Sequence, residues 1–407
     1  MMKKRNLGTL ALSMENLKAK PVRTACLVIV AAILAFTLFG GSILTLNLRQ
    51  GLAAMTKRFG ADLMVVPEGS STKAQSLLLR GGTGYFYFDE AIADKIARTE
   101  GIARASPQFF LTSLSESCCD AMVQLIAYDP ETDFVVQPWI AEKYSGSVKD
   151  GQVVVGSRIT VRADNTIRLL GHNYPAAARL SRSASGLDVS IFMTMNTMRL
   201  LLGRARADGY NFLAVQEKAM QRGTVSAVLA KIDPTDSPAR LSKSIGRENS
   251  GVDVVVSQSI FSGIAETLAG LSAYIHLFSV ILWILALIIL AAIFSLSIHE
   301  RKKEFAVLRI LGATRWKLAG MVLSESVITG FSGGLMGVLL AGLVVFPFST
   351  LISERLELPY LDAPLFSILP LVLGSLLLSA LVGPLASLYS AFRISRAETY
   401  FTMREGE

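Results

Sequence analysis

The most regular feature of the chain is a set of four long apolar segments that contain no Asp, Glu, Lys or Arg. They cover residues 24–48, 271–298, 326–353 and 363–392. A helix rises about 1.5 Å per residue, so roughly 20 apolar residues cross a hydrocarbon core about 30 Å thick. Each segment reaches that length, whereas helices of globular proteins average about 11–12 residues. The pattern predicts four transmembrane helices.

The first apolar segment has to be distinguished from a cleaved secretory signal, because basic residues precede it. Its apolar stretch exceeds the roughly 7–15 residues of a signal sequence, and no small-x-small cleavage site ends it. We therefore interpret it as a membrane span. The preceding residues 1–23 place Leu7, Leu10, Leu12 and Leu17 among polar residues, a pattern compatible with a short helix in the membrane interface.

Residues 49–270 have the mixed pattern of an α+β domain inserted between the first and second spans. A run that begins with Asp89 and keeps Ile92 and Ile96 on one face predicts a helix at residues 89–99. The flanking runs at residues 51–59 and 259–270 could continue the two neighbouring spans outward as a helical stalk. Alternating or β-branched runs predict strands at residues 61–67, 121–129, 151–156, 226–233 and 252–258.

Lys and Arg near the span ends predict which side of the membrane each connection faces. Residues 1–23, the loop at 299–317 and the tail are rich in these residues, whereas the loop at 354–362 has more acids than bases. Both termini are therefore expected in the cytoplasm. The expected location of the protein is the inner membrane of the cell. The predicted order is a cytoplasmic segment at 1–23, spans at 24–48, 271–298, 318–353 and 363–392, an extracytoplasmic domain at 49–270, a cytoplasmic coupling loop at 299–317, an outer loop at 354–362 and a cytoplasmic tail at 393–407.

Composition agrees with this assignment. Hydrophobic residues make up 51% and charged residues 18% of the 407 positions, and the mean hydropathy is +0.46. Soluble domains carry nearer a quarter charged residues. The net charge of +8 lies mostly beside the spans, so anionic lipid explains it better than nucleic acid, which we do not expect as a partner.

The spans themselves contain few groups that could run an ion-coupled cycle. Only His276 and Glu325 are ionisable there, and the position of each is compatible with anchoring at the interface. Energy must therefore enter elsewhere. The third span carries small residues at four-residue spacing, which predicts close packing with another helix or with a second copy of the chain, at Gly330, Gly333, Gly334 and Gly337.

The loop between the second and third spans reads ERKKEFAVLRILGATRWKLAGMVLSES from Glu300 to Ser326. Phe305, Leu308 and either Ile310 or Leu311 are expected on one face of a short helix. Gly312 can end that helix in a left-handed conformation. A short amphipathic helix and a sharp turn between two rigid spans suit the transmission of a push.

This loop resembles the charged, Gly-Ala-containing stretch of the MacB/FtsX-like permeases of ABC transporters. The matching positions are Glu304, Leu308, Gly312, Ala313 and Glu325. The order of one span, a large outer domain and three further spans is also similar to that family. The segment FGADLMVVPEG at residues 59–69 and the Arg-rich end at residues 383–405 resemble the opening of a MacB-type outer domain and the family's closing stretch.

The resemblance implies that an ATPase subunit docks under the loop. The expected coupling residues are Glu304, Phe305, Leu308, Arg309, Gly312 and Ala313. The sequence contains no Gly-Lys dipeptide, so a Walker A phosphate cradle is excluded and the ATPase is expected to be a separate chain. The tail reads Ala-Glu-Thr-Tyr at residues 397–400 where family members more often have Asp-Pro, so its contact with the partner is expected to differ.

The implied complex contains two permeases, identical or homologous, in the lipid bilayer. We expect no cofactor on this chain, with ATP and Mg²⁺ bound by the partner ATPase, and an outer partner such as a periplasmic adaptor or a substrate-binding protein. The function implied is ATP-driven export or extraction of a substrate at the outer face. The alternative is a complex that transports nothing and activates an extracytoplasmic enzyme such as a cell-wall hydrolase.

Other candidate chemistry is weaker. Cys118 and Cys119 are adjacent and could contact a substrate or a thiophilic metal, cross-link to another chain or be small buried residues; remote candidate ligands are His172, Met193, Met195 and Met198. Acidic residues at 129–133 precede an expected exposed aromatic, Trp139. The aromatic run after the Gly-rich turn at residues 81–84 predicts a ligand-gripping loop or an edge strand. With three histidines far apart, no hydrolase triad or zinc site can be assembled, and we expect no enzyme activity.

Overall fold

The computed structural model describes residues 9–82, 84–112, 123–355 and 359–396. The chain divides into two compact units. The first comprises residues 1–47, 269–350 and 363–407, and the second comprises residues 48–268 and 351–362.

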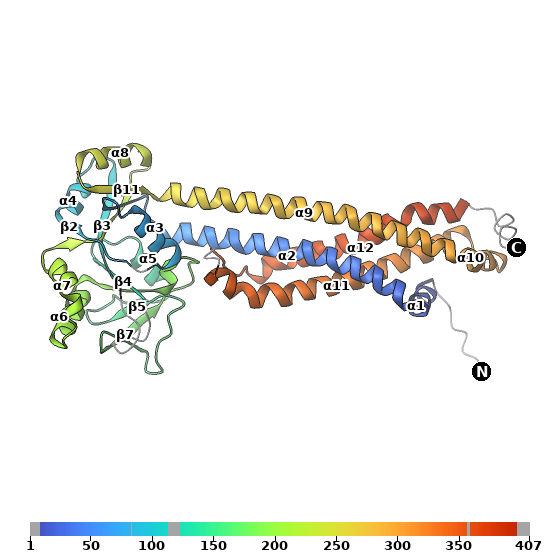
Figure 1. Ribbon diagram of the computed structural model, residues 1–407, viewed down its shortest axis with the longest axis horizontal. Coiled ribbons are helices and arrows are strands. Elements are labelled where there is room, and N and C mark those ends of the chain that lie inside the picture. The colour runs from blue at the N-terminus through green and yellow to red at the C-terminus, as the bar shows by residue number, and fades with distance from the viewer. Residues whose placement is uncertain (1–8, 83, 113–122, 356–358, 397–407) are drawn as a thin grey trace. The chain divides into compact units, whose positions relative to one another are not determined.

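The first unit is a bundle of helices (Figure 1). Among the described residues, four helices are long and apolar enough to cross a membrane. This confirms the predicted fold class, a polytopic helical membrane protein with an inserted domain. The helices that contribute to the bundle are α1 (Thr9–Ala19), α2 (Pro21–Phe59), α9 (Ser257–Glu300), α10 (Lys302–Ile310), α11 (Arg315–Arg355) and α12 (Leu365–Arg396).

Helix α2 lies at the centre of the bundle. Its Leu27 and Leu34 pack against Phe294 of α9 and Val382 of α12. One turn further along, Ala35, Phe39 and Ile43 of α2 pack against Val338 and Ala341 of α11. The opposite face of α9 is apolar and exposed, as expected of a helix that faces lipid, at Tyr274, Leu277, Phe278, Ile281, Ile284 and Ile288.

The small residues of α11 form two contact stripes within the chain. A Cβ at Gly333 or Gly337 would lie 2.5 Å from Val28 O or 2.2 Å from Ala32 O, both in the backbone of α2. A Cβ at Gly330 would lie 2.6 Å from Ser379 O of α12, and one at Gly334 would lie 3.0 Å from the Ser379 side chain. The four glycines therefore allow α11 to approach two helices of its own chain closely.

The second unit is built on a nine-stranded mixed sheet with the order β11-β1-β10-β3-β4-β8-β5-β7-β6, together with a two-stranded sheet of β2 and β9. The pairs β4/β8 and β5/β7 are parallel and the other pairs are antiparallel. The strands are β1 (Leu63–Pro67), β2 (Phe88–Asp89), β3 (Ile102–Thr112), β4 (Gln124–Tyr128), β5 (Val153–Val155), β6 (Thr166–Leu169), β7 (His172–Arg179), β8 (Ser190–Thr194), β9 (Thr224–Val225), β10 (Ala227–Ile232) and β11 (Val252–Val256).

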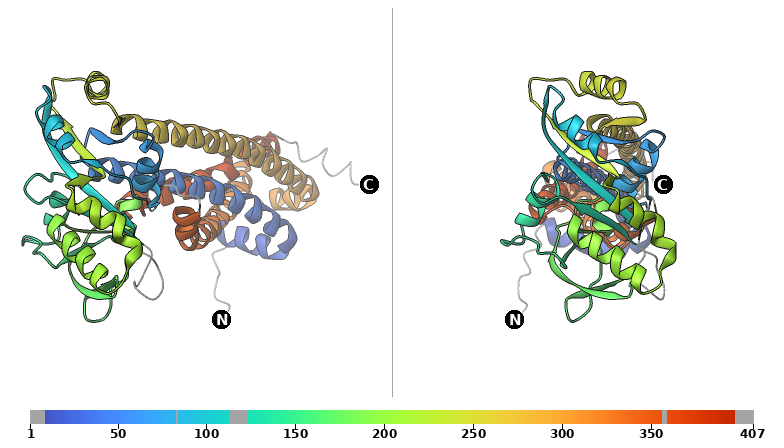
Figure 2. Two further views of the ribbon diagram at one scale, coloured as in Figure 1. Left: turned by 60° about the vertical axis from the view of Figure 1, so that its left-hand side comes forward. Right: turned by 90° about the vertical axis from the view of Figure 1, so that its left-hand side faces the viewer.

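Helices cover both faces of this sheet. Successive side chains of a strand point to opposite sides, so both faces carry apolar side chains that have to be covered. In β3, Phe109 and Leu111 face one layer and Phe110 faces the other. Figure 2 shows α6 and α7 side by side against the sheet. The helices of the unit are α3 (Ser71–Arg80), α4 (Ala91–Ala97), α5 (Val136–Ala141), α6 (Met195–Ala207), α7 (Ala214–Gln221) and α8 (Pro238–Glu248), with 3₁₀ turns at Gly186–Val189 and Asn211–Leu213.

All five predicted strands are found, as β1, β4, β5, β10 and β11, and the predicted helix is α4. The carboxylate of Asp89 accepts a hydrogen bond from Ala91 N at 2.8 Å, and Ile96 is fully buried. The long strand β3 was not predicted. Its sequence IARASPQFFLT alternates poorly and contains Pro107, yet it pairs with β10 and β4 on its two sides.

One expectation about aromatic residues of this unit is wrong, and for another the structure selects one of two alternatives. Trp139 is only 2% exposed, so it is a core residue and not an exposed anchor; its Nε1 donates to Ser181 Oγ at 3.1 Å. Of the two alternatives for the aromatic run after residue 84, the edge strand is found, because Phe88 of β2 pairs with Val225 of β9. Before it, Phe86 packs edge-to-face on Phe110 and Tyr87 stacks on Phe109.

Candidate functional site

The short helix α10 and the start of α11 form a helical hairpin at one end of the bundle. The helix ends in a left-handed turn, since Gly312 has a φ of +94°. Gly312 N donates to Arg309 O and Ala313 N donates to Leu308 O, both at 3.0 Å. These two bonds are the Schellman arrangement that satisfies the last carbonyls of a helix. The prediction of a left-handed cap at Gly312 is confirmed.

The inner face of α10 holds the hairpin together. Phe305 is 4% exposed and packs with Leu308 and Ala313 against a buried cluster of α11 that includes Leu318 and Val322. Three of the six predicted coupling residues, Phe305, Leu308 and Ala313, therefore contact their own chain. Phe305 is buried and positions the hairpin, whereas Leu308 and Ala313 are partly exposed.

The outer face of the same hairpin is also apolar. Val307 is 52% exposed, Ile310 65%, Leu311 77% and Trp316 78%. Ile310 and Leu311 thus do not share the face of Phe305 and Leu308, which corrects the expected grouping. We refer to Val307, Ile310, Leu311 and Trp316 as the hairpin surface. Exposed Lys303 and Lys317 lie in the same segment, so the surface has a basic margin.

A buried ion cluster lies directly behind the hairpin. The Glu325 side chain of α11 is 2% exposed and accepts hydrogen bonds from two arginines. Arg301 Nη1 donates to its two carboxylate oxygens at 3.0 and 3.2 Å, and Arg23 Nη2 of α2 donates at 3.2 Å. Glu325 therefore connects helices within the protein, whereas the sequence suggested a residue that anchors the chain at the membrane interface.

Arg301 is the only residue between α9 and α10, and its side chain is 5% exposed. Besides Glu325 it contacts Glu304, with Nε to Oε2 at 2.9 Å, and its guanidinium lies over the ring of Phe305 at 4.9 Å. One side chain thereby ties the end of α9 to α10 and to α11. The predicted coupling residue Glu304 contributes to this joint with a half-exposed side chain.

Helix α1 completes the cluster. Asn16 Nδ2 donates to Glu325 Oε1 at 3.1 Å, and the Ser13 hydroxyl donates to Met321 O at 3.2 Å. The segment before the first span therefore packs on α11 through polar side chains that the sequence pattern did not single out. The sequence did not identify Arg23, Arg301 and Asn16 as a cluster. Their common partner, Glu325, lies far from each of them in the sequence and meets them only in the folded bundle.

In the second unit, the ends of α2 and α9 join neighbouring strands. Helix α9 follows β11 without a connecting residue, and β11 pairs with β1, which follows α2 after a short turn. Asp62 in that turn accepts from Lys231 Nζ at 3.1 Å and from Ile232 N at 3.0 Å. Phe59 contacts Phe261 edge-to-face at 5.8 Å. Both helices are thus bound firmly to the sheet.

Of the speculative metal ligands, Met193, Met195 and Met198 pack in one apolar core cluster. Cys118 and Cys119 lie outside the described residues. Met193 and Met198 are buried in the core of the sheet, and His172 Nε2 contacts Asp208 Oδ2 at 2.6 Å. Within the part of the chain that the structure describes, no group of three or more His, Cys, Asp or Glu side chains could hold a metal ion.

Solved structures with some likeness to the chain include one periplasmic region and one extracellular domain. One is the periplasmic region of MacB from Actinobacillus actinomycetemcomitans, at 10% identity and a TM-score of 0.33, with 51% of this chain and 95% of that chain covered. The other is the extracellular domain of the noncanonic ABC-type transporter YknZ from Gram-positive bacteria, at 10% identity and a TM-score of 0.27, with 48% and 98% covered. No curated protein sequence matches the chain significantly.

The comparison that bears on the bundle is a family match. Residues 276–399 match the family described as FtsX-like permease C-terminal. The matched region contains α10, the hairpin surface and Glu325. For this part of the chain, the match confirms the resemblance to the FtsX-like permeases, and it supports a role of the ABC permease type.

Proposed function

We propose that this chain is the permease subunit of an ABC transporter in which a separate ATPase subunit supplies the energy. The ATPase binds the hairpin surface from the cytoplasm, and its nucleotide cycle moves the outer domain to export or extract a substrate. A second permease, identical or homologous, completes the complex. ATP and Mg²⁺ are bound by the ATPase and not by this chain.

The observation that carries the proposal is the hairpin surface itself. Four large apolar side chains, each more than half exposed, gather on one tight turn whose inner face is fully packed. An apolar patch rimmed by polar residues is typical of a site that binds a protein partner. The Schellman turn and the Arg301 joint make the hairpin rigid enough to pass on a displacement.

The route from the hairpin consists of buried contacts and two continuous helices. Arg301 joins α10 to α9, and α9 is one continuous helix from Ser257 to Glu300. Helix α2 is continuous from Pro21 to Phe59 and meets the same ion cluster through Arg23. Movement of α10 is therefore expected to act on the two helices that join β1 and β11.

The proposal is tested by co-purification of the chain with a co-expressed ABC ATPase. Leu311→Ser removes an apolar side chain that is 77% exposed on the hairpin surface. Leu365→Ser is the matched control, because Leu365 is 81% exposed at the start of α12. We expect Leu311→Ser to lower the recovered ATPase several-fold and Leu365→Ser to leave it unchanged. Equal recovery with both variants would mean that lipid, and not an ATPase, covers the hairpin surface.

A further inference from the structure

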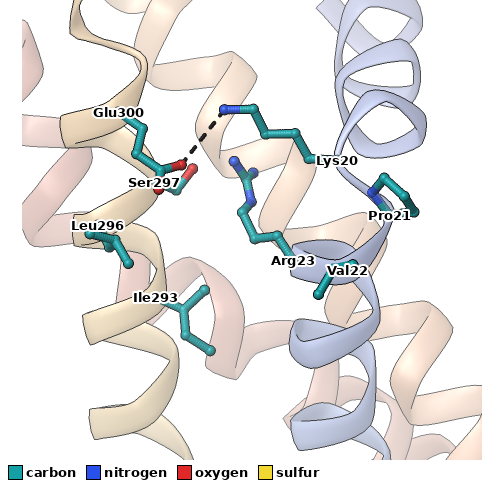
Figure 3. Close-up of a pocket in the computed structure, with 8 residues that line it drawn as sticks. All are labelled: Lys20, Pro21, Val22, Arg23, Ile293, Leu296, Ser297 and Glu300. Atoms are coloured by element: carbon teal, nitrogen blue, oxygen red, sulfur yellow. Dashed lines mark ion pairs between the residues drawn. The ribbon is translucent and has the colours of Figure 1, made fainter.

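A groove lies between the start of α2 and the end of α9. It has a volume of about 410 Å³ and is lined by Lys20, Pro21, Val22, Arg23, Ile293, Leu296, Ser297 and Glu300. Figure 3 shows that these side chains are sorted by polarity along the helices. The polar ends of Lys20, Arg23, Ser297 and Glu300 lie at one level, and Val22, Ile293 and Leu296 lie below them.

The apolar level of the groove is open. Val22 is 78% exposed and Leu296 is 64% exposed, and both belong to helices that are long and apolar enough to cross a membrane. Such a surface in a membrane is covered by acyl chains. The polar level directly above it therefore meets the headgroups of the same lipid molecules.

The charges at the polar level favour an anion. Lys20 Nζ lies 3.7 Å from Glu300 Oε2, and both side chains are substantially exposed, at 38% and 53%. So loose a surface pair contributes little to stability and can exchange partners. Arg23 pairs with Glu325, a carboxylate that it shares with Arg301, and Arg301 pairs with Glu304 as well.

Arg23 also has a donor without an acceptor. Its Nε is buried and has no hydrogen-bond partner among the described residues. A buried donor without a partner is unfavourable, so an acceptor close to this edge of the guanidinium is strongly favoured. A phosphate oxygen in the groove, after a small rotation of the Arg23 side chain, is such an acceptor.

We propose that this groove binds one phospholipid with an anionic headgroup, its phosphate between Lys20 and Arg23 and an acyl chain along Val22, Ile293 and Leu296. The lipid takes Lys20 from Glu300 and adds an acceptor for Arg23. Arg23 also binds Glu325, so a lipid in this site contacts the ion cluster behind the hairpin. The lipid composition of the bilayer can therefore affect that cluster. The proposal depends on the membrane location of the bundle and not on the identity of the ATPase.

The test places a fluorescent reporter in the groove of the full chain. Leu296→Trp is made in a chain with Trp283→Phe and Trp316→Phe, while buried Trp139 gives a constant background. The protein is reconstituted in bilayers of phosphatidylcholine and phosphatidylglycerol, in which one or the other lipid carries brominated acyl chains that quench a contacting Trp. We expect the groove to prefer phosphatidylglycerol about fivefold, the contribution of one basic side chain near the headgroups.

Three further variants distinguish a specific lipid site from a general attraction of anionic lipid to the basic residues of the protein. Lys20→Gln should bring the preference close to one, and Glu300→Gln should raise it. Lys303→Gln is the control, since Lys303 is exposed on α10 and does not line the groove. Equal quenching by both lipids in the parent chain, an unchanged preference in Lys20→Gln, or an equal loss in Lys303→Gln would overturn the proposal.

Discussion

Arg301 donates from a single nitrogen to both carboxylate oxygens of Glu325, at 3.0 and 3.2 Å, although the two residues lie on either side of the hairpin. The pair is almost completely buried, with side chains 5% and 2% exposed. It closes the hairpin at its base in the way that the Schellman turn closes it at its tip. The rigid unit between these two points is the element that we expect to receive the ATPase.

Replacement of Glu325 by Gln should strongly destabilise the bundle. It leaves Arg301 and Arg23 buried without their common carboxylate, and breaking a buried ion pair on one side costs about 3–5 kcal/mol. Glu300→Gln is the control, because its pair with Lys20 is exposed and contributes about 0–1 kcal/mol. The measurement is thermal unfolding of the purified chain in detergent. An equally small effect of both substitutions would show that the cluster is not the joint described above.

Gly312→Ala should weaken coupling through the backbone alone. A Cβ at this position meets no atom within 4 Å, so the only penalty is the φ of +94°, which costs an L residue about 1–2 kcal/mol. Gly320→Ala adds the same methyl group to α11, also in open space, without a positive φ. We expect lower ATPase activity of the complex with Gly312→Ala only. Partial recovery is expected with Gly312→Asn, since Asn tolerates the left-handed conformation better.

Gly337→Ala should disturb the packing of α11 on α2. The added Cβ would lie 2.2 Å from Ala32 O and 2.9 Å from Phe36 N, and backbone atoms cannot move aside as a side chain does. Overpacking of this kind costs about 1–3 kcal/mol. Gly342→Ala in the same helix meets only Phe346, at 3.8 Å, and should be tolerated. The melting temperature in detergent should fall by several degrees for Gly337→Ala and stay constant for Gly342→Ala.

Asp133 should give the outer domain a pH dependence of stability. Its Oδ2 caps α5 by accepting from Val136 N at 2.8 Å and Gln137 N at 2.7 Å, while burial raises the pKa of this carboxyl from 3.8 to about 6. The folded state therefore holds a proton where the unfolded chain has lost it. The free energy of unfolding should rise as the pH falls from about 6 to about 4, by up to about 3 kcal/mol.

Asp133→Asn isolates this effect, because the amide oxygen can still accept from the backbone but does not titrate. Denaturation is followed by the fluorescence of Trp139 in a chain with Trp283→Phe and Trp316→Phe. The difference between the parent and the variant should change with pH in the direction given above. A constant difference over this range would mean that Asp133 keeps an ordinary pKa.

The sequence was sufficient to predict the membrane class and much of the outer sheet. Runs of apolar residues without charge report lipid directly, and β1, β4, β5, β10 and β11 have the alternating or β-branched patterns of buried strands. Strand β3 escaped prediction because its first half is largely exposed, so apolar and polar positions do not alternate there.

The candidate site could be located from the sequence but not assembled. The loop and Gly312 were visible, since a left-handed turn after an apolar helix has a local signature. The sequence did not show which apolar residues face inward. Phe305 and Leu311 are both large and apolar, and only the packing of α11 decides which of them is buried. A second apolar stripe at residues 307, 310 and 311 has helical spacing and would have indicated the hairpin surface. Arg23 and Arg301 had no local signal, since ion pairs between distant helices depend on packing.

Coupling to a cytoplasmic ATPase requires that the hairpin faces the cytoplasm and that the sheet domain faces outward. This is measured by labelling intact cells with a membrane-impermeant maleimide after Cys26, Cys118 and Cys119 have been replaced by Ser. Lys303 of α10 and Lys143 beyond α5 are both exposed, so each can carry a single introduced cysteine. We predict that Lys143→Cys is labelled and that Lys303→Cys is labelled only after the cells are opened. Labelling of Lys303→Cys in intact cells, with Lys143→Cys protected, would contradict the proposed coupling to a cytoplasmic ATPase.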